Sequence, residues 1–334
     1  MELFQLSRAN DVRDAIAAGA ASPTAQHGAQ VRFLAGGTTL LDLMKLNVEH
    51  PGRVVDISRL PLNDVEATPD GGVKIGATVR NADLAMHPLI RDRYAVLSQA
   101  LLSGASAQLR NMATTGGNLL QRTRCVYFRD TAMPCNKRTP GAGCAAIGGF
   151  NRTMAILGTS DACIASNPSD MNVALTALDA TIHIEGIRGS RHIAIDDFFL
   201  LPGATPQRET VLEPGDLITH VTLPPLPEGS NSLYLKLRDR ASYEFALASA
   251  AVVIKVVDGR MAHARVALGG VGTKPWHSRE AEAALHDAVP DAATFARAAD
   301  AALAGARPQS QNGFKVELAR RCLVHALTQA TRTA

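Results

Sequence analysis

Four of the chain's five cysteines lie in one short, irregular stretch. Cys125, Cys135, Cys144 and Cys163 are close together, whereas Cys322 stands alone near the C-terminus. The stretch around them, from Asn111 to Asn167, is rich in Gly, Thr, Asn and Cys and has neither a helical nor a strand period. A long irregular segment inside a compact domain is usually functional. We therefore expect the cysteines to hold this segment in shape, because few apolar residues in it could do so.

The spacing of the four cysteines leaves the nature of their site open. It contains no Cys-x-x-Cys pair, which weakens a zinc-finger interpretation. Four thiolates can hold Zn²⁺ or a 4Fe-4S cluster. The surrounding residues have a surplus of positive charge that suits either anionic centre, with Arg122, Arg124, Arg129, Lys137, Arg138 and Arg152 against Asp130 and Asp161. The remaining alternative is four unrelated thiols.

Two glycine pairs lie in the first half of the chain. Ala35-Gly36-Gly37-Thr38-Thr39-Leu40 comes between an expected strand and an expected helix, and Ala113-Thr114-Thr115-Gly116-Gly117-Asn118 precedes an apolar pair. Adjacent glycines let backbone N–H groups turn toward an anion, which a helix N-terminus also favours. Neither loop has the spacing of a dinucleotide fingerprint or a P-loop. Two such loops predict a ligand with an extended phosphate chain, although each alone could be a tight strand–helix turn.

The pattern along the chain predicts an α+β protein of two parts. We expect strands at 31–34, 53–57 and 73–77, a helix at 40–46, and two helical stretches from Asn81 through Leu101. The proline-rich run at 224–229 is typical of a linker. Beyond it, strands are expected at 233–237, 247–257 and 262–268, followed by helices at 277–303 and 314–328. Asp258-Gly259 predicts a hairpin turn, and Cys322 falls on the apolar face of the last helix.

Composition excludes several functions. The 34 basic residues are scattered among 31 acidic ones, which does not favour a nucleic-acid binder. No apolar run is long enough for a membrane span, and we expect the chain to have no export signal of its own. Pro168-Ser169-Asp170 is by itself a helix cap, and the alternating charges from Lys236 to Arg240 are more typical of a solvated strand. We find no catalytic triad or paired carboxylates.

Together these elements resemble the flavin subunits of the xanthine dehydrogenase and carbon monoxide dehydrogenase family. In that family an Ala-Gly-Gly-x-x loop and a Thr-x-Gly-Gly-Asn loop hold the FAD pyrophosphate. Further matches in the same order are Arg110-Asn111, Pro168-Ser169-Asp170, Lys236 and the run from Gly269 to Pro275. The resemblance implies a FAD-binding domain of the vanillyl-alcohol-oxidase (PCMH) type over residues 1–225 and a small C-terminal domain of sheet and helices over residues 230–334.

The cysteine segment resembles an insertion found in the FAD subunits of bacterial periplasmic aldehyde oxidoreductases. The match includes the residues from Asn118 to Cys125, the runs Pro134 to Arg138 and Pro140-Gly141, and Ala162 to Ala165. Because that insertion holds a 4Fe-4S cluster, the resemblance assigns residues 119–167 to such an insertion. Its implied metal ligands are Cys125, Cys135, Cys144 and Cys163.

The resemblance also implies which residues contact FAD. The pyrophosphate and ribityl chain would lie against two loops, with Asp170 at the ribose region, Ile218 at the isoalloxazine edge and Lys236 at a polar edge of the flavin. Neither loop contains a histidine, so FAD is expected to be bound non-covalently. The loop residues are Phe33, Leu34, Ala35, Gly36, Gly37, Thr38, Thr39, Leu40, Thr114, Thr115, Gly116, Gly117 and Asn118.

The function implied is that of one subunit in a heterotrimeric oxidoreductase. A large subunit with a molybdenum cofactor would oxidise aldehydes to carboxylic acids, a small subunit with two 2Fe-2S clusters would relay electrons, and this chain's FAD would pass them to an external acceptor. The expected compartment is the periplasm, by export with a partner that has a Tat signal, or else the cytoplasm. Two alternatives stay open at this point: the flavin subunit of a hydroxybenzoyl-CoA reductase or other molybdenum hydroxylase, and a zinc-stabilised binding module without redox activity.

Overall fold

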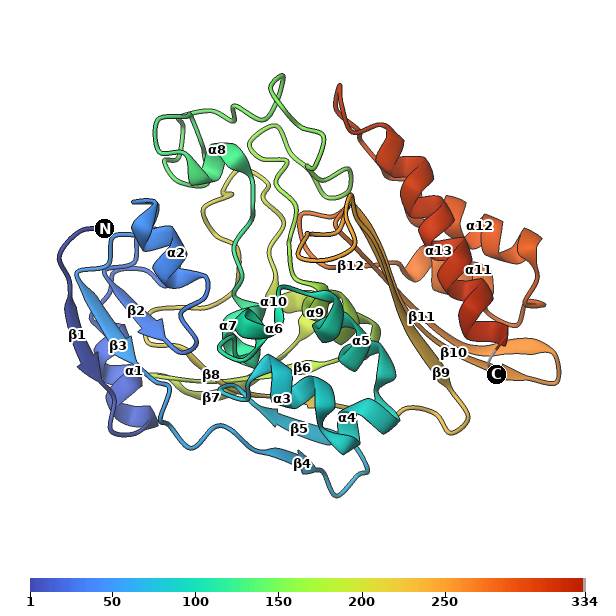
Figure 1. The fold of residues 1–334 in the computed structure, drawn as a ribbon, viewed down its shortest axis with the longest axis horizontal. Coiled ribbons are helices and arrows are strands. Elements are labelled where there is room, and N and C mark those ends of the chain that lie inside the picture. Colours follow the sequence, from blue (N-terminus) through green and yellow to red (C-terminus); the bar gives the residue numbers. More distant parts are fainter. Residues whose placement is uncertain (333–334) are drawn as a thin grey trace.

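The computed structural model describes residues 1–332, which form three β-sheets (Figure 1). The first is a small parallel sheet at the N-terminus with strand order β1-β3-β2. Parallel neighbours need crossover connections, which helices α1 and α2 supply. The elements of this unit are β1 (Gln5–Arg8), α1 (Val12–Ala20), β2 (Val31–Leu34), α2 (Leu40–Lys45) and β3 (Arg53–Asp56).

The second sheet is antiparallel and has the order β4-β5-β8-β6-β7. Its buried face shares one apolar core with several helices, among which α5 and α9 contribute the most buried residues. Because β8 pairs with both β5 and β6, this sheet joins segments that are far apart in the sequence. Its elements are β4 (Val65–Ala67), β5 (Val73–Gly76), α3 (Asn81–Met86), α4 (Pro88–Arg93), α5 (Ala95–Ser103), α9 (Asp170–Ala177), β6 (Thr181–Gly186), β7 (Gly189–Ala194) and β8 (Leu217–Leu223).

The third sheet belongs to the C-terminal part, and its central strand is buried on both faces. In β10 (Ala248–Val257), Val252 and Ile254 face a core formed with the C-terminal helices, whereas Ala251 and Val253 face the core around α5 and α9. Successive side chains of a strand point to opposite faces, so an unbroken apolar run suits this position. The other elements are β9 (Asn231–Leu237), β11 (Arg260–Gly269), β12 (Trp276–His277), α11 (Arg279–Leu285), α12 (Ala292–Leu303) and α13 (Phe314–Arg332).

The cysteine-bearing segment is almost free of regular structure, as the sequence predicts. Residues 120–169 are all described, and the single helix among them is α8 (Val126–Arg129). The returning half of the segment is attached to the C-terminal part. Ile156 and Leu157 lie in its core, and both their N–H groups donate to the carbonyl of Val271. The buried ammonium of Lys315, at the start of α13, donates to the Met154 carbonyl at 2.9 Å.

The expected α+β class is confirmed, and most expected elements are present within a residue or two of their predicted ends. The region from Asn81 to Leu101 is a correction, because it contains three helices rather than two. A break falls at Pro88, which disfavours helical geometry at the preceding residue. The predicted helix at 277–303 is likewise two helices, separated by residues 286–291, which include Pro290.

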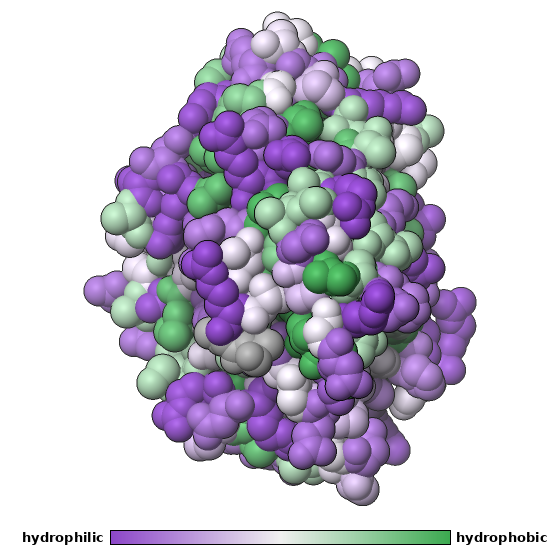
Figure 2. All heavy atoms as spheres, turned by 90° about the vertical axis from the view of Figure 1, so that its right-hand side faces the viewer, coloured by the Kyte–Doolittle hydropathy of each residue, from purple (hydrophilic) through white to green (hydrophobic). Residues whose placement is uncertain are grey.

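Within residues 1–332, none of the helices has the length and apolar character needed to cross a bilayer. The face that carries α13 and the C-terminus is mainly hydrophilic, with hydrophobic residues scattered singly over it (Figure 2). Such scattered residues are normal on a folded domain.

One histidine bridges the two parts of the chain. His277 in β12 contacts Asp196 Oδ2 through Nδ1 at 2.5 Å and Glu282 Oε1 through Nε2 at 2.7 Å. Asp196 belongs to α10 (Ile195–Phe198) and Glu282 to α11, so the ring lies between the N-terminal part and the C-terminal part of the chain. Burial on its own lowers the pKa of His277, but the hydrogen bonds to the two carboxylates outweigh it, and the pKa lies above 6.5.

We expect this bridge to make stability depend on pH. Because the folded-state pKa of His277 is raised, its contribution is fully present below pH 6.5 and is lost as pH rises through the folded pKa. In His277→Gln, the free energy of unfolding from urea titrations should fall less between pH 6 and pH 9 than in the wild type. His286→Gln is the matched control, because His286 is an exposed histidine that lines the same surface groove as His277. This variant should keep the wild-type dependence of the unfolding free energy on pH. If the unfolding free energy depends on pH equally in the wild type and in His277→Gln, the proposed contribution of His277 to stability is wrong.

Candidate cofactor site

The first glycine loop connects β2 to α2 and presents free backbone N–H groups. The first helical hydrogen bond runs from Leu41 N–H to the Gly37 carbonyl at 3.0 Å, so the preceding N–H groups have no helical acceptor. Gly37 has a φ of +73°, a conformation that a side chain would strain. A Cβ on Gly36 would overlap the Met112 carbonyl, which shows how closely the two loops approach each other. α2 has only six residues, so the amides matter more than the helix dipole.

The second loop has a different role, because most of its N–H groups are already paired. Thr115 donates to the Val79 carbonyl and Gly116 to the Ala77 carbonyl, at 2.9 and 2.8 Å. Thr114 caps α7 (Thr115–Leu119) by accepting from Gly117 N–H at 3.3 Å. A Cβ on Gly117 would meet Thr114 Oγ1 alone. This loop therefore fixes the shape of the cleft, and the anion-binding amides come mainly from the first loop.

Two cavities flank these loops, and Thr38, Thr39 and Gly117 border both of them. A ligand that crosses the loops could thus place one ring system in each cavity. What we call the Ile218 cavity also contains Phe33, Leu34 and Leu217. What we call the Lys236 cavity contains residues from four parts of the chain, namely Arg110, Asn118, Gln121, Arg124, Asp170, Lys236, Arg240, Tyr243 and Phe245. An extended dinucleotide fits this arrangement.

The structure brings Asp170 and Lys236 together. Lys236 Nζ lies 2.8 Å from Asp170 Oδ2, and it also donates to the Ser103 carbonyl at 3.1 Å. The other carboxylate oxygen of Asp170 accepts from Tyr234 Oη at 2.5 Å. Burial first, and then the charge of Asp170, raise the pKa of Tyr234 well above 10, so the phenol stays protonated and donates. Asn118 is fixed nearby, where its Oδ1 accepts from the Ser169 hydroxyl at 2.7 Å.

Ile218 and Lys236 are not brought together. Ile218 is a buried residue of β8 that lines one cavity, whereas Lys236 lines the other. The sequence analysis assigned both residues to edges of the flavin ring. In the structure the two residues line different, adjacent cavities that share Thr38, Thr39 and Gly117.

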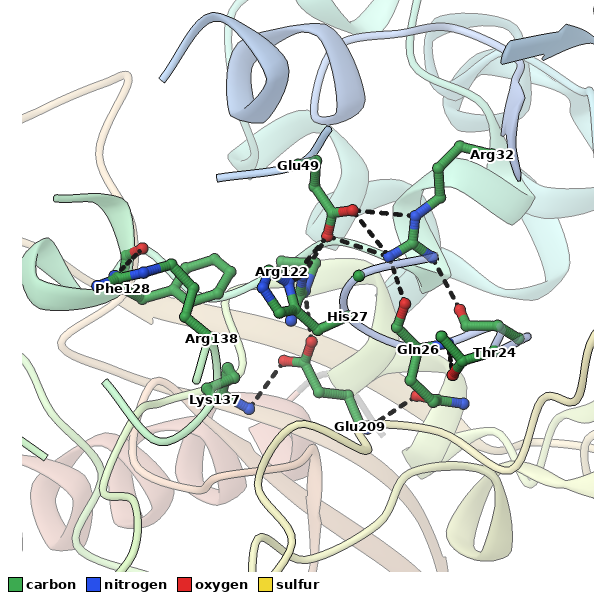
Figure 3. A network of polar contacts seen from close by, with 12 residues as sticks. Thr24, Gln26, His27, Arg32, Glu49, Arg122, Phe128, Lys137, Arg138 and Glu209 are labelled. Atoms are coloured by element: carbon green, nitrogen blue, oxygen red, sulfur yellow. Dashed lines mark hydrogen bonds and ion pairs between the residues drawn. The ribbon is translucent and has the colours of Figure 1, made fainter. Parts of the chain in front are cut away.

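A buried ionic network lies beside the Ile218 cavity (Figure 3). Arg122 contacts Glu49 and also Glu209, the latter at 2.5 Å, and Arg32 contacts Glu49 at 2.9 Å. Lys137, from the cysteine segment, contacts Glu209 at 2.9 Å. Burial alone raises the pKa of Glu209, but Arg122 and Lys137 dominate and lower it to about 2. Three cations thus face two ionised carboxylates, which leaves one net positive charge beside the cysteine segment.

The four clustered cysteines lie in or against one apolar cluster. Cys125, Cys135 and Cys163 are buried in one apolar cluster, and Cys144 packs against it. Cys135 and Cys144 face each other across a short antiparallel bridge, and the thiols are free. Among residues 1–332, no three His, Cys, Asp or Glu side chains are grouped closely enough to hold one metal ion. Burial raises the pKa of Cys125 to about 11, so its thiol ionises only when something stabilises the thiolate.

Sequence analysis missed the network and the position of Arg124. The positive charges of Arg122 and Arg124 were noted only as a surplus, and their partners Glu49, Asp42 and Glu209 lie far away in the chain. The one available signal was the Arg-x-Arg-Cys run, which puts two cations directly before Cys125.

Comparisons with known proteins find similarity along nearly the whole chain. Residues 2–226 match the model of the FAD binding domain in molybdopterin dehydrogenase, and residues 233–330 match that of the CO dehydrogenase flavoprotein C-terminal domain. The chain is 50% identical to the aldehyde oxidoreductase FAD-binding subunit PaoB of Escherichia coli, over 100% of both chains. It is 30% identical to the glyceraldehyde dehydrogenase medium chain of Sulfolobus acidocaldarius, covering 75% of this chain and 72% of that one.

Solved structures give the same picture. A chain of carbon monoxide dehydrogenase from Hydrogenophaga pseudoflava superimposes with a TM-score of 0.77 at 26% sequence identity, and the alignment covers 99% of this chain and 98% of that chain.

We expect Gly37→Val to lower FAD occupancy about tenfold, because a branched side chain at φ +73° strains the loop and blocks the approach of an anion to its amides. FAD per purified protein, measured by absorbance after gel filtration, tests this. Gly229→Val is the matched control, since Gly229 has the same φ but lies in open space outside both cavities. Full FAD occupancy in Gly37→Val would show that FAD does not depend on this loop.

Proposed function

This chain belongs to the family of FAD-binding subunits of molybdopterin dehydrogenases, and on that premise we propose that it is the flavin subunit of a molybdenum-dependent aldehyde oxidoreductase. The observation that carries the substrate class is the full-length identity of 50% to an aldehyde oxidoreductase FAD-binding subunit. In this proposal a molybdenum subunit oxidises aldehydes to carboxylic acids, and a 2Fe-2S subunit relays the electrons. This chain passes them to an external acceptor, and the three subunits form a heterotrimer.

FAD supplies the redox chemistry, while the protein positions it and adjusts its electrostatics. The pyrophosphate binds the amides of the first loop, opposite the shape-determining second loop. The isoalloxazine occupies the Lys236 cavity, because the cations Arg110, Arg124 and Arg240 are gathered there. The adenosine occupies the Ile218 cavity, where Phe33, Leu34 and Leu217 offer apolar contacts. Asp170 and its partner Lys236 form a fixed polar wall next to the ribityl chain.

The four clustered cysteines hold a 4Fe-4S cluster in this proposal. The support is their convergence in one apolar cluster within a segment that has almost no regular structure of its own. Binding of the cluster would require thiols such as Cys125, whose pKa burial has raised, to lose their protons, and it would couple cluster binding to the folding of the segment. The positive charge of the neighbouring network, above all Lys137, offsets the negative charge of the four thiolates.

We expect Cys135→Ser to remove iron and acid-labile sulfide from the purified complex, because serine replaces one of four thiolate ligands. Cys322→Ala is the matched control: Cys322 is also buried, but it lies on α13 outside the cysteine cluster. Iron content and the visible spectrum after subtraction of the flavin are the measurements. Wild-type iron content in Cys135→Ser would refute this ligand set.

The direction of electron flow is tested with a flavin-free subunit. Gly37→Val and Gly117→Val together should exclude FAD, since Gly117 borders both cavities. The assembled complex should then bleach its iron–sulfur absorbance once on addition of an aromatic aldehyde and stall. Its steady turnover with a quinone-like acceptor should fall close to background.

Sustained turnover with the same acceptor in the flavin-free complex would show that electrons leave from another centre. Failure to bleach would instead mean that this subunit takes part in the oxidation of substrate. The wild-type complex, which should bleach and recover as acceptor is added, is the reference for both outcomes.

A further inference from the structure

The start of the cysteine segment runs alongside the cofactor cavities. Leu120 and Arg122 border the Ile218 cavity, whereas Gln121 and Arg124 border the Lys236 cavity. Cys125 follows directly. The same short run of backbone therefore forms one wall of the dinucleotide site and leads into the cysteine cluster.

Arg124 is held in the Lys236 cavity from two directions. Its Nη1 donates to Asp42 Oδ2 at 3.1 Å, and its guanidinium carbon lies 4.9 Å from the ring centroid of Phe245. Its Nε is buried, and within the described part of the chain it has no hydrogen-bond partner. A buried donor of a charged group that lacks an acceptor is costly. A ligand in the cavity that it borders can supply the acceptor.

A purely structural role for Arg124 is not sufficient. Arg129 contacts the same Asp42 oxygen at a shorter distance, 2.8 Å, so α2 is connected to the cysteine segment without Arg124. Arg129 does not border the cavity. Contact with α2 therefore explains neither the position of Arg124 at the Lys236 cavity nor its unpaired Nε–H.

Among the described residues, two cations of the cavity lack a carboxylate of their own, namely Arg124 and Arg110, which donates to the Gly104 carbonyl at 2.7 Å, and of the two only Arg124 belongs to the cysteine segment. Lys236 is paired with Asp170 at 2.8 Å, and Arg240 with Glu244 at 3.5 Å. By contrast, two guanidinium groups, those of Arg124 and Arg129, share the single carboxylate of Asp42. A net positive charge therefore remains at the cavity wall that the cysteine segment forms.

We propose that Arg124 is a flavin contact supplied by the cysteine-bearing segment, with its Nε–H binding an electron-rich oxygen or nitrogen on the edge of the isoalloxazine. This inference rests on the proposed placement of the flavin in the Lys236 cavity. Uptake of two electrons and one proton gives the flavin one negative charge, so a buried cation at its edge favours the reduced form. Arg124 raises the flavin midpoint potential and tightens FAD binding.

The same contact couples the two cofactor regions. Arg124 is joined by a peptide bond to Cys125, one of the buried thiols of the cysteine cluster. Whatever orders the cysteine segment therefore also fixes the guanidinium against the flavin. In this chain the cysteine site acts as a support for the flavin site.

The test compares three variants in the assembled complex. Arg124→Gln should retain wild-type iron content, weaken FAD binding about tenfold and shift the flavin midpoint potential to a more negative value. Arg124→Lys, which keeps the charge, should recover part of the potential. Arg129→Gln is the matched control, because it removes the other guanidinium from Asp42, and its FAD affinity and potential should equal those of the wild type. The measurements are FAD titration of the stripped complex and equilibrium redox titration.

Unchanged potential and FAD affinity in Arg124→Gln would overturn the inference. So would an equal shift in Arg129→Gln, because the effect would then come from Asp42. Lys236→Gln separates this failure from that of the proposed function. If Lys236→Gln shifts the flavin potential while Arg124→Gln does not, the flavin is in the expected cavity and only the role of Arg124 is wrong. If neither variant shifts it, the placement of the isoalloxazine is wrong.

Discussion

The buried ion network around Arg122 is the interaction on which the arrangement of the site depends. Arg122, at the start of the cysteine segment, joins Glu49 of the N-terminal unit to Glu209 of the loop before β8, and Lys137 of the same segment also contacts Glu209. Buried charges are stable only when their partners are in place. Removing one partner leaves the other charge buried and unpaired, which lowers the free energy of unfolding by about 3–5 kcal/mol. Three regions that are distant in the sequence therefore have to fold together. The walls of the Ile218 cavity and the start of the cysteine segment result from that one condition.

The cysteine segment is consequently fixed at both ends by polar contacts of the protein itself. The network holds its first half, and at its return Asn312 and Lys315 donate to the carbonyl of Met154, which lies between Cys144 and Cys163. Between these anchors the shape depends on the cysteine cluster and on Arg138, which donates to the carbonyls of nearby residues. An irregular chain of this kind can satisfy its backbone groups without a sheet or helix because side chains substitute for the missing partners.

Sequence reasoning succeeded where the signal is local. The apolar run of β10, the Asp258-Gly259 hairpin and the glycine loops each depend on residues within a few positions, and the structure contains the strand and the turn as predicted. It could not show that β8 pairs with β5 and β6, or that Arg122 meets Glu49, because those contacts join segments with no shared pattern. It also could not show that Ile218 and Lys236 line different cavities, since an alignment of motifs gives no information about which cavity a residue lines.

The two glycine loops differ in function because they differ in what their amides already bind. The second loop donates to Val79 and Ala77, next to β5, so it is part of the sheet scaffold and its position is set before any ligand binds. The first loop leaves its amides open and approaches the second so closely that Gly36 tolerates no side chain against Met112. A rigid wall opposite an open set of donors is a preorganised anion site, in which little reorganisation is needed on binding. The sheet scaffold thus determines the geometry of the cleft, and the small N-terminal unit supplies amides that are open to an anion.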